Sequence, residues 1–480
     1  MGRLSELISN PQGLYSLLAY DEGGSSSTSE VEFAKTSNTG SRAQIRRAIR
    51  ALLPSFVSRP LRRRSDAEYI DDHDNGAILP KPNSTSYLNG LRGLASLVVA
   101  MQHNTNDYFP ANHRGWGDPP GEHHIIQLPL IRLILDGSFA VTIFFVISGF
   151  ALSYGPLKKM HQGKAEQAIS AIPSSVFRRP VRLFTPVVPV LVFSNIVMIR
   201  WLSVFYQNET ENLLPPQPSF LAELHHTWAE LLQTVITGVA PATMPQIWTL
   251  AVEYQGSLLI FLCCLTFARV TSVMRMCFVT AIFCWQWYLG QWQLSLFLAG
   301  MILADLKLLR PEFPSLGRRT RAVVDAGNWV MLFMALYLGG WPIYGDGGAT
   351  LGFTYFNWVP TGNVPQQRFW HSVSAIMLVF SLENMAGGKL QSWLNARWLL
   401  YLGEISYGLY LVHWMVGMNS LTKGTIIRLR RLPGCSSFLA WLVGFTISMP
   451  LCIWVGDLHW RFVDKKSVRL AKWLSDAVGI

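Results

Sequence analysis

The sequence predicts an all-α, polytopic membrane protein with about ten transmembrane helices. Half of its 480 residues are hydrophobic and only 14% are charged, whereas soluble domains carry about 25% charged residues. From Leu88 onward one apolar run follows another, each near the roughly 20 residues that a helix needs to cross the hydrocarbon layer. The predicted spans are 88–106, 133–156, 181–206, 246–268, 271–289, 291–306, 328–344, 369–386, 399–418 and 437–457.

Composition also narrows the class of function. The 18 Trp, 26 Phe and 15 Tyr suit the two membrane–water interfaces, so the lipid bilayer is the first expected partner. The six cysteines form no Cys-x-x-Cys pair and most sit in apolar runs, which predicts neither a disulfide framework nor a metal site. The net charge of +11 is explained by basic cytoplasmic flanks, and we expect no nucleic-acid partner.

The N-terminal region, residues 1–86, is expected to be a disordered basic cytosolic tail. It is polar, holds an Arg-rich stretch, and contains no apolar core of signal-peptide length, so the first span is expected to direct insertion. Residues 45–61 mix apolar residues with arginine and predict either a surface helix on anionic lipid or a solvated tail. Residues 87–465 form the predicted membrane domain, followed by a cytosolic tail at 466–480.

Orientation follows from the distribution of Lys and Arg between loops. Eleven precede Leu88, and residues 157–182, 305–327 and 458–480 hold six, five and five. The alternate loops hold fewer: two in 107–132, none in 207–245 and one in 345–368, although 419–436 holds four. Ten spans then place both termini in the cytosol, with the protein expected in the endoplasmic reticulum or another endomembrane.

Two Asn-x-Ser/Thr sequons and two histidine pairs fall outside the predicted spans. Asn208 lies in a predicted lumenal loop and is the expected glycosylation site, whereas Asn83 lies on the cytosolic side. The pairs His123-His124 and His225-His226 lie in lumenal loops, where solvated histidines are more common than metal ligands.

Ionisable residues within the spans are functional hypotheses, because a charge at membrane depth is costly. Arg92 and His103 are eleven residues apart, close to three helical turns, so they share one face about 16 Å apart along the axis. Each also has a structural interpretation: Arg92 as a snorkelling anchor and His103 as a packing residue.

Three further segments combine polar groups with apolar runs. In the segment from Asp136 to Phe150, Ser148 and Gly149 let neighbouring helices approach closely. Arg179 and Arg182 lie on one face of a helix start, where they can hold phosphate or only anchor topology. Glu253 lies in the apolar run that follows Trp248, placed either to orient a histidine or to pair with an arginine.

In this order the motifs resemble the membrane acyltransferase 3 family, which includes bacterial polysaccharide O-acetyltransferases and nodulation-factor acetyltransferases. The resemblance covers roughly residues 87–465 and rests on YLNGLRGLASLVVAMQH, GSFAVTIFFVISGF, FRRPVRLFTP, IWTLAVE and YLGEISYGLYLVHW. Two departures favour a divergent, fungal branch. Asn89 stands where the family often has Asp, and Asp464-Lys-Lys stands where it often has an acidic residue, Arg and Pro.

The resemblance implies an enzyme that transfers an acyl group, usually acetyl, from acyl-coenzyme A to a hydroxyl, with no tightly bound cofactor. His103 is the expected general base, because imidazole titrates near neutral pH, and Glu253 is expected to orient it. Arg92, Arg179 and Arg182 are expected to hold the coenzyme A phosphates. Candidate oxyanion or substrate contacts are Ser148, Trp248, Tyr407 and His413.

The acceptor stays open at this stage. The fungal resemblance favours an acceptor hydroxyl on a small metabolite, with a role in secondary-metabolite biosynthesis. A cell-surface glycan is the alternative acceptor. A transporter without enzymatic activity, its pathway lined by the same charges, is the remaining reading. Turnover of acetyl-coenzyme A separates the enzyme from the transporter.

Overall fold

A computed structural model describes residues 52–55, 83–118, 120–202, 217–241, 243–310, 317–385, 387–417 and 420–480. The predicted N-terminal tail, most of the 45–61 segment and Asn208 lie outside these ranges. The chain divides into two compact units, residues 1–53 and 54–480, and the second unit contains all the structure discussed below. Within the described ranges the regular secondary structure is helical, with no strand.

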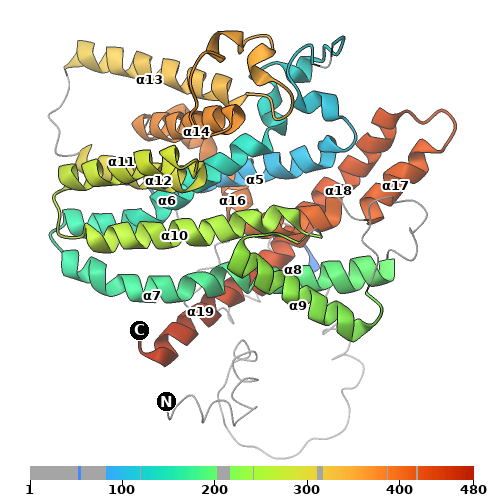
Figure 1. Cartoon of the computed structure of the whole chain (residues 1–480), viewed down its shortest axis with the longest axis horizontal. Coiled ribbons are helices and arrows are strands. Elements are labelled where there is room, and N and C mark those ends of the chain that lie inside the picture. The colour runs from blue at the N-terminus through green and yellow to red at the C-terminus, as the bar shows by residue number, and fades with distance from the viewer. Residues whose placement is uncertain are drawn as a thin grey trace, which may run out of the picture. The chain divides into compact units, whose positions relative to one another are not determined.

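A helix occupies each predicted span (Figure 1). These helices are α5 (Ser86–Asn106), α6 (Gly137–His161), α7 (Ala165–Phe184) continued by α8 (Val187–Val192), α10 (Trp248–Thr266), α11 (Ser272–Tyr288), α12 (Trp292–Leu309), α13 (Arg318–Gly339), α14 (Gln366–Asn384), α16 (Arg397–Gly417) and α18 (Ser437–His459).

Six helical segments of the described chain are long and apolar enough to cross a membrane. They contain α6, α7 with α8, α10, α12, α13 and α18. Among the other four, α11 has 17 residues, while α5, α14 and α16 carry polar side chains such as Arg92, Glu383 and Glu404. Polar residues lower the mean hydropathy of a helix whose polar face is turned toward other helices, so a search for apolarity alone misses α5, α14 and α16.

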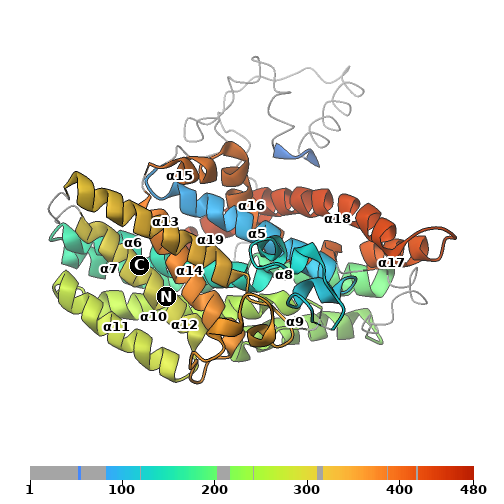
Figure 2. The same ribbon diagram turned by 90° about the horizontal axis from the view of Figure 1, so that it is seen from above.

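Close helix contacts hold the bundle together, chiefly α5 against α16 and α6 against α12. Glycine permits both. A Cβ atom at Gly93 would lie 2.4 Å from the Gly403 nitrogen, and one at Gly149 would lie 2.0 Å from the Phe297 oxygen. The prediction that Gly149 allows close approach is confirmed. Figure 2 shows α5, α16 and α18 along one side of this unit and α10, α11 and α12 along the other.

The span predicted at 181–206 is interrupted. Helix α7 begins earlier, at Ala165, and ends at Phe184, after which α8 and a π-helical stretch (Phe193–Leu202) continue the chain. Pro186 has no N–H to donate, and side chains from other helices hold the interruption. The Tyr407 hydroxyl donates to the Leu183 carbonyl, and His459 Nε2 lies 2.8 Å from the Pro186 carbonyl.

Four other α-helices of the described residues were not predicted as spans, the shortest of them α15 (Lys389–Leu394). Residues 207–245, expected to be a loop, contain α9 (Phe220–Thr237), which Ser219 caps and Gly238 ends with a φ of 76°. Helix α17 (Ser420–Arg430) follows α16, and α19 (Lys465–Val478) packs on α7. The loop prediction for 220–237 was wrong because the segment has the mixed polar and apolar face of a surface helix, which a search for long apolar runs passes over.

Candidate active site

The charged residues singled out within the spans converge on one hollow, here called the central cavity. Its volume is about 220 Å³, and helices α5, α6, α7, α10 and α16 supply its walls. Six sequence-selected residues line it: Arg92, Ser148, Arg179, Arg182, Glu253 and Tyr407. Glu404 and Asp464 add two carboxylates, and Val141, Phe144, Phe145, Leu183, Thr249, Leu250, Ser406 and Tyr410 complete the lining.

The two arginines of α7 differ in their partners. Arg179 forms an ion pair with Glu253 of α10, and its Nε donates to the Ser257 hydroxyl at 2.7 Å. Ser148 lines the same cavity as this ion pair. Arg182 lines the same cavity, yet it has no ion pair or hydrogen bond with any described residue. Arg182 is therefore the arginine of the pair whose donors are available to a ligand.

Arg92 is partly engaged. Its Nη2 donates to the Gly403 carbonyl at 2.9 Å, while its buried Nε has no partner in the described structure. One turn earlier, Asn89 Nδ2 donates to Glu404 Oε1 at 2.9 Å. This contact gives a physical reason for Asn at a position where the resembled family often has Asp, because a second carboxylate there would repel Glu404.

A second hollow, the basic cavity, adjoins the central cavity. Its volume is about 290 Å³, and Lys159, Arg178, Arg179 and Arg182 line it together with apolar and small residues of α6, α7 and α10. No Asp or Glu is among its described lining residues. Arg179 and Arg182 line both hollows, so the basic cavity and the central cavity adjoin each other at these two arginines.

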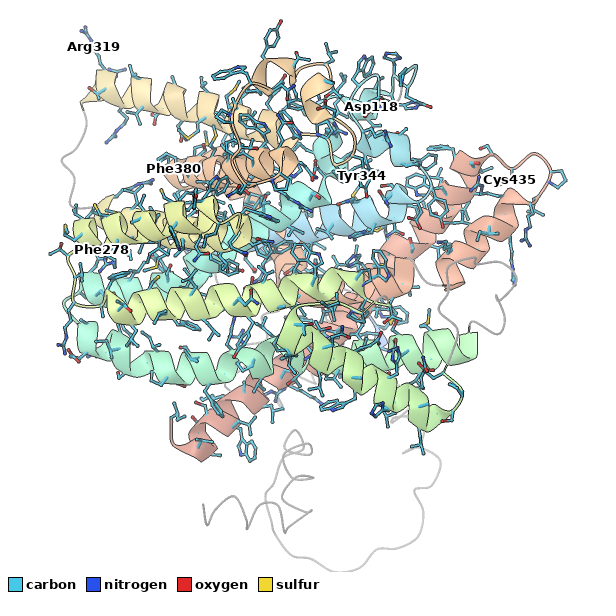
Figure 3. The ribbon with its side chains drawn as sticks, in the orientation of Figure 1. Asp118, Phe278, Arg319, Tyr344, Phe380 and Cys435 are labelled. Carbon is cyan, nitrogen blue, oxygen red and sulfur yellow. The ribbon has the colours of Figure 1, made fainter. Side chains whose placement is uncertain are left out.

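His103 lies in a third hollow, the histidine cavity, with a volume of about 310 Å³. Its imidazole stacks on that of His413 at a centroid distance of 5.3 Å and meets the Trp414 ring edge-on at 4.9 Å. In the described chain neither ring nitrogen of His103 has a hydrogen-bond partner. Tyr344, labelled in Figure 3, and Trp248 line the same cavity.

The ring of His413 stacks on the ring of His103. It is fully buried, and its Nδ1 lies 2.7 Å from the Tyr410 carbonyl. A carbonyl only accepts, so Nδ1 carries the proton of the neutral ring and Nε2 is left as a bare acceptor, unpaired among the described atoms. This backbone contact fixes the orientation of the ring on which His103 stacks.

Two residues connect the central cavity with the histidine cavity. Val141 of α6 and Tyr410 of α16 line both. The Tyr410 hydroxyl donates to the Gln246 carbonyl at 2.8 Å and lies 2.8 Å from the Thr249 hydroxyl. The three hollows therefore follow one another, with residue pairs shared at each boundary.

The structure separates some residues that the sequence analysis grouped. Arg92 and His103 share a face of α5 but line different cavities. Glu253 is expected to orient His103, yet its ion-pair partner is Arg179, and it lines the central cavity but not the histidine cavity. The Tyr407 hydroxyl, a candidate donor, directs its proton at Leu183.

Sequence reasoning missed several residues of this site. Lys159 and Arg178 were noted only as parts of longer motifs, although their place at one end of α6 and α7 was a usable signal. Glu404 and Tyr410 lie within YLGEISYGLYLVHW, each three positions from Tyr407, and a search for polar residues at that helical spacing would have found both. Arg368, which lines the histidine cavity, carried no local signal.

Comparison with known proteins and protein families matches this chain to acyltransferases. A family model described as an acyltransferase domain, acyltransferase 3, matches residues 85–457. The chain is 31% identical to the O-acetyltransferase PaAT-1 of Phomopsis amygdali, with 82% of this chain and 84% of that protein aligned. It is 24% identical to the acyltransferase R4 of a Phoma species (81% and 95% aligned) and to the acyltransferase clz18 of Cochliobolus lunatus (70% and 84%). No solved structure matches.

The domain match covers most of the chain and includes all the residues of the three cavities except Asp464. The apolar helices and this domain together identify an integral membrane enzyme. The chain therefore belongs to the acyltransferase 3 family and is an acyltransferase.

Proposed function

We propose that the enzyme is an acyl-coenzyme A-dependent O-acyltransferase that transfers acetyl to a hydroxyl of a small molecule. The observation that carries this proposal is the row of three adjoining cavities, basic at one end and lined by His103 at the other. The printed name of PaAT-1, an O-acetyltransferase, supports acetyl as the acyl group. The limited volume of the histidine cavity, about 310 Å³, supports a small acceptor over a glycan chain.

Coenzyme A is a polyanion joined to its thioester by a long pantetheine arm. The basic cavity offers Lys159 and Arg178 to the phosphates, and Arg182 is free to bind them from the boundary with the central cavity. The pantetheine arm then extends through the central cavity, between Arg92 and the aromatic wall. The 16 Å or so between Arg92 and His103 along α5 suits an extended arm with its thioester beside Val141 and Tyr410.

His103 is the proposed general base. It removes the proton from the acceptor hydroxyl as the oxygen attacks the thioester carbonyl, which forms a tetrahedral oxyanion. Collapse of the oxyanion breaks the carbon–sulfur bond, and the imidazolium returns the proton to the departing thiolate. Trp248 lines the histidine cavity and its indole N–H has no partner among described groups, so it is the best-placed of the candidate donors to the oxyanion.

The proposed topology has ten spans and cytosolic termini. The basic cavity is formed by the end of α6 and by α7, largely from the Lys- and Arg-rich 157–182 segment, which the distribution of basic residues predicts to be cytosolic. That is the side on which acyl-coenzyme A is made. If the host membrane is the endoplasmic reticulum, Asn208 carries glycan and Asn83 does not. A glycosidase shift that survives Asn208→Gln but disappears in Asn83→Gln would invert this orientation.

Release of free coenzyme A tests the function directly. The purified protein in detergent is incubated with acetyl-coenzyme A, and the free thiol is measured with and without an extract of the producing organism as acceptor source. The expected result is slow hydrolysis of acetyl-coenzyme A in the absence of the extract and faster release of the thiol in its presence. Absence of both thiol release and acetyl-coenzyme A binding would favour the transporter instead. Deletion of the gene, followed by mass spectrometry, then identifies a metabolite lighter by one acetyl group.

A further inference from the structure

We propose that Arg368 recognises a carboxylate on the acceptor, so that the substrate is a hydroxylated carboxylic acid. This inference rests on the proposed function, because it assigns the acceptor to the histidine cavity. Arg368 stands in the first turn of α14 and lines that cavity together with His103. It is the only Asp, Glu, Lys or Arg among the described lining residues.

The guanidinium group of Arg368 is held in place but not neutralised. It lies 5.1 Å from the centre of the Trp292 ring, a cation–π contact that uses none of its N–H donors in a hydrogen bond. Within the described chain Arg368 makes no ion pair and no hydrogen bond. A partly buried arginine without a partner in a membrane domain is costly, and a carboxylate ligand with two oxygens matches its geometry.

The nearest acid does not take this role. Asp136 attracts Arg368 electrostatically, but it caps α6 by accepting from the Phe139 nitrogen at 2.8 Å and faces His371 Nε2 at 3.4 Å. Asp136 does not line the cavity. The field of Asp136 helps to keep Arg368 charged, while the donors of Arg368 remain available to a ligand.

Other lining groups match a substrate with more than one oxygen. Gln367 Nε2 and Gln246 Oε1 are buried and have no partner among the described atoms. Gln246 is oriented by its own Nε2, which donates to the Leu411 carbonyl at 3.1 Å. Trp248 and Trp414 supply aromatic walls. The cavity therefore suits an apolar body with a hydroxyl at His103 and a carboxylate at Arg368.

The experiment compares hydroxy acids with their methyl esters, which keep the hydroxyl and the shape but lose the charge. The probes are 4-(hydroxymethyl)benzoic acid, 12-hydroxydodecanoic acid and lithocholic acid. Binding of each acid and ester to the protein in lipid nanodiscs is measured by thermal shift and Trp fluorescence, at saturating coenzyme A. Binding, unlike turnover, does not require His103 chemistry, and acetyl-coenzyme A hydrolysis is measured separately on the same preparations.

For at least one probe size, the acid is expected to bind at least tenfold more tightly than its ester. Arg368→Gln should abolish that preference and leave the weaker ester binding in place, whereas Arg368→Lys should restore the preference in part. Arg114→Gln, which removes a solvent-facing arginine paired with Asp118, is the matched control and should change nothing.

Several outcomes would overturn the inference. Esters that bind as well as acids in all three sizes, no binding of any probe, or an acid preference that survives in Arg368→Gln would each refute carboxylate recognition by Arg368. Weakened coenzyme A binding in Arg368→Gln would assign the residue to the donor instead. If the wild-type protein does not hydrolyse acetyl-coenzyme A but still binds acids more tightly than esters, the proposed function is refuted and carboxylate recognition by Arg368 is not.

Discussion

Arg179 of α7 and Glu253 of α10 form an ion pair across the central cavity, with about 15% of each side chain exposed. The two residues are 74 positions apart in the chain, so the pair also ties two helices together. One turn after Arg179, Arg182 faces the same cavity without a partner among described residues. Glu253 therefore holds Arg179 in an ion pair, whereas the donors of Arg182 are available to a ligand.

This asymmetry predicts different phenotypes for the two arginines. Arg182→Ala should weaken acyl-coenzyme A binding about ten- to hundredfold, since a charge-assisted hydrogen bond contributes about 1.5–3 kcal/mol, with little effect on stability. Isothermal titration with coenzyme A and a thermal melt measure both. Arg269→Ala, in a surface pair with Glu166, is the control. Unchanged coenzyme A affinity in Arg182→Ala would leave Arg182 as a topology anchor.

Arg179→Ala should instead destabilise the protein, because it leaves Glu253 as a buried, unpaired carboxylate, at a cost of about 3–5 kcal/mol. The double variant Arg179→Ala/Glu253→Gln should recover much of the lost stability, since it removes both charges. Melting temperatures of the two single variants and the double variant give the coupling. Additive effects would show that the ion pair is not the reason for the instability.

His103→Ala should lower turnover by about a hundred- to ten-thousandfold while coenzyme A binding and expression stay near wild type. A general base acts on the transition state, so its loss falls on kcat rather than on donor binding. Thiol release and coenzyme A affinity are measured on one monodisperse preparation. His225→Ala, on the exposed face of α9, is the matched control. Near-normal turnover in folded His103→Ala protein would refute the role.

A buried ion pair outside the candidate active site gives a prediction about the stability of the helix bundle. Arg275 of α11 and Asp305 of α12 are each 2% exposed and 2.6 Å apart, and His161 at the end of α6 lies 2.7 Å from the same carboxylate. Arg275→Met should cost about 3–5 kcal/mol, and adding Asp305→Leu should recover most of it.

The control for this pair is Arg319→Met, at the exposed start of α13 and labelled in Figure 3. Denaturation in a mild detergent compares all four proteins. Equal stability of Arg275→Met and Arg319→Met would show that the cluster does not hold α6, α11 and α12 together.

His113, in the segment between α5 and α6, predicts a dependence of stability on pH. Burial lowers the pKa of His113 from 6.5 to about 4, with Asp136 raising it and Arg132 lowering it further. Because the folded-state pKa lies below the unfolded value, its contribution is complete above pH 6.5 and is lost progressively as pH falls toward 4. Between pH 7 and pH 5 the expected loss is about 2 kcal/mol.

His113→Gln removes the titrating group but keeps a polar partner for Thr105, whose hydroxyl lies 3.1 Å from His113 Nε2. Melting temperatures at pH 7 and pH 5 should therefore differ less in this variant than in the wild type. An identical pH dependence in both proteins would assign the acid sensitivity to other groups.

The helices of the membrane domain were predictable because their signal is local. A span is recognised from about 20 consecutive residues, and a helix occupies each of the ten predicted positions. The shared face of Arg92 and His103 followed in the same way from 3.6 residues per turn. The surface helix α9 was missed because polar and apolar residues are mixed along it at helical spacing and form no long apolar run.

The sequence by itself therefore determined the membrane class, the helices of the predicted spans and the family, together with a minority of the residues that line the cavities, among them Arg92, His103 and Arg182. Only the tertiary structure decided which of them meet: Glu253 lies beside Arg179 and not beside His103, Asn89 bonds to Glu404 across 315 positions of chain, and Arg368 enters the histidine cavity. The physical reason is that periodicity specifies which face of a helix is polar, whereas the partner of that face depends on helix packing between segments far apart in sequence.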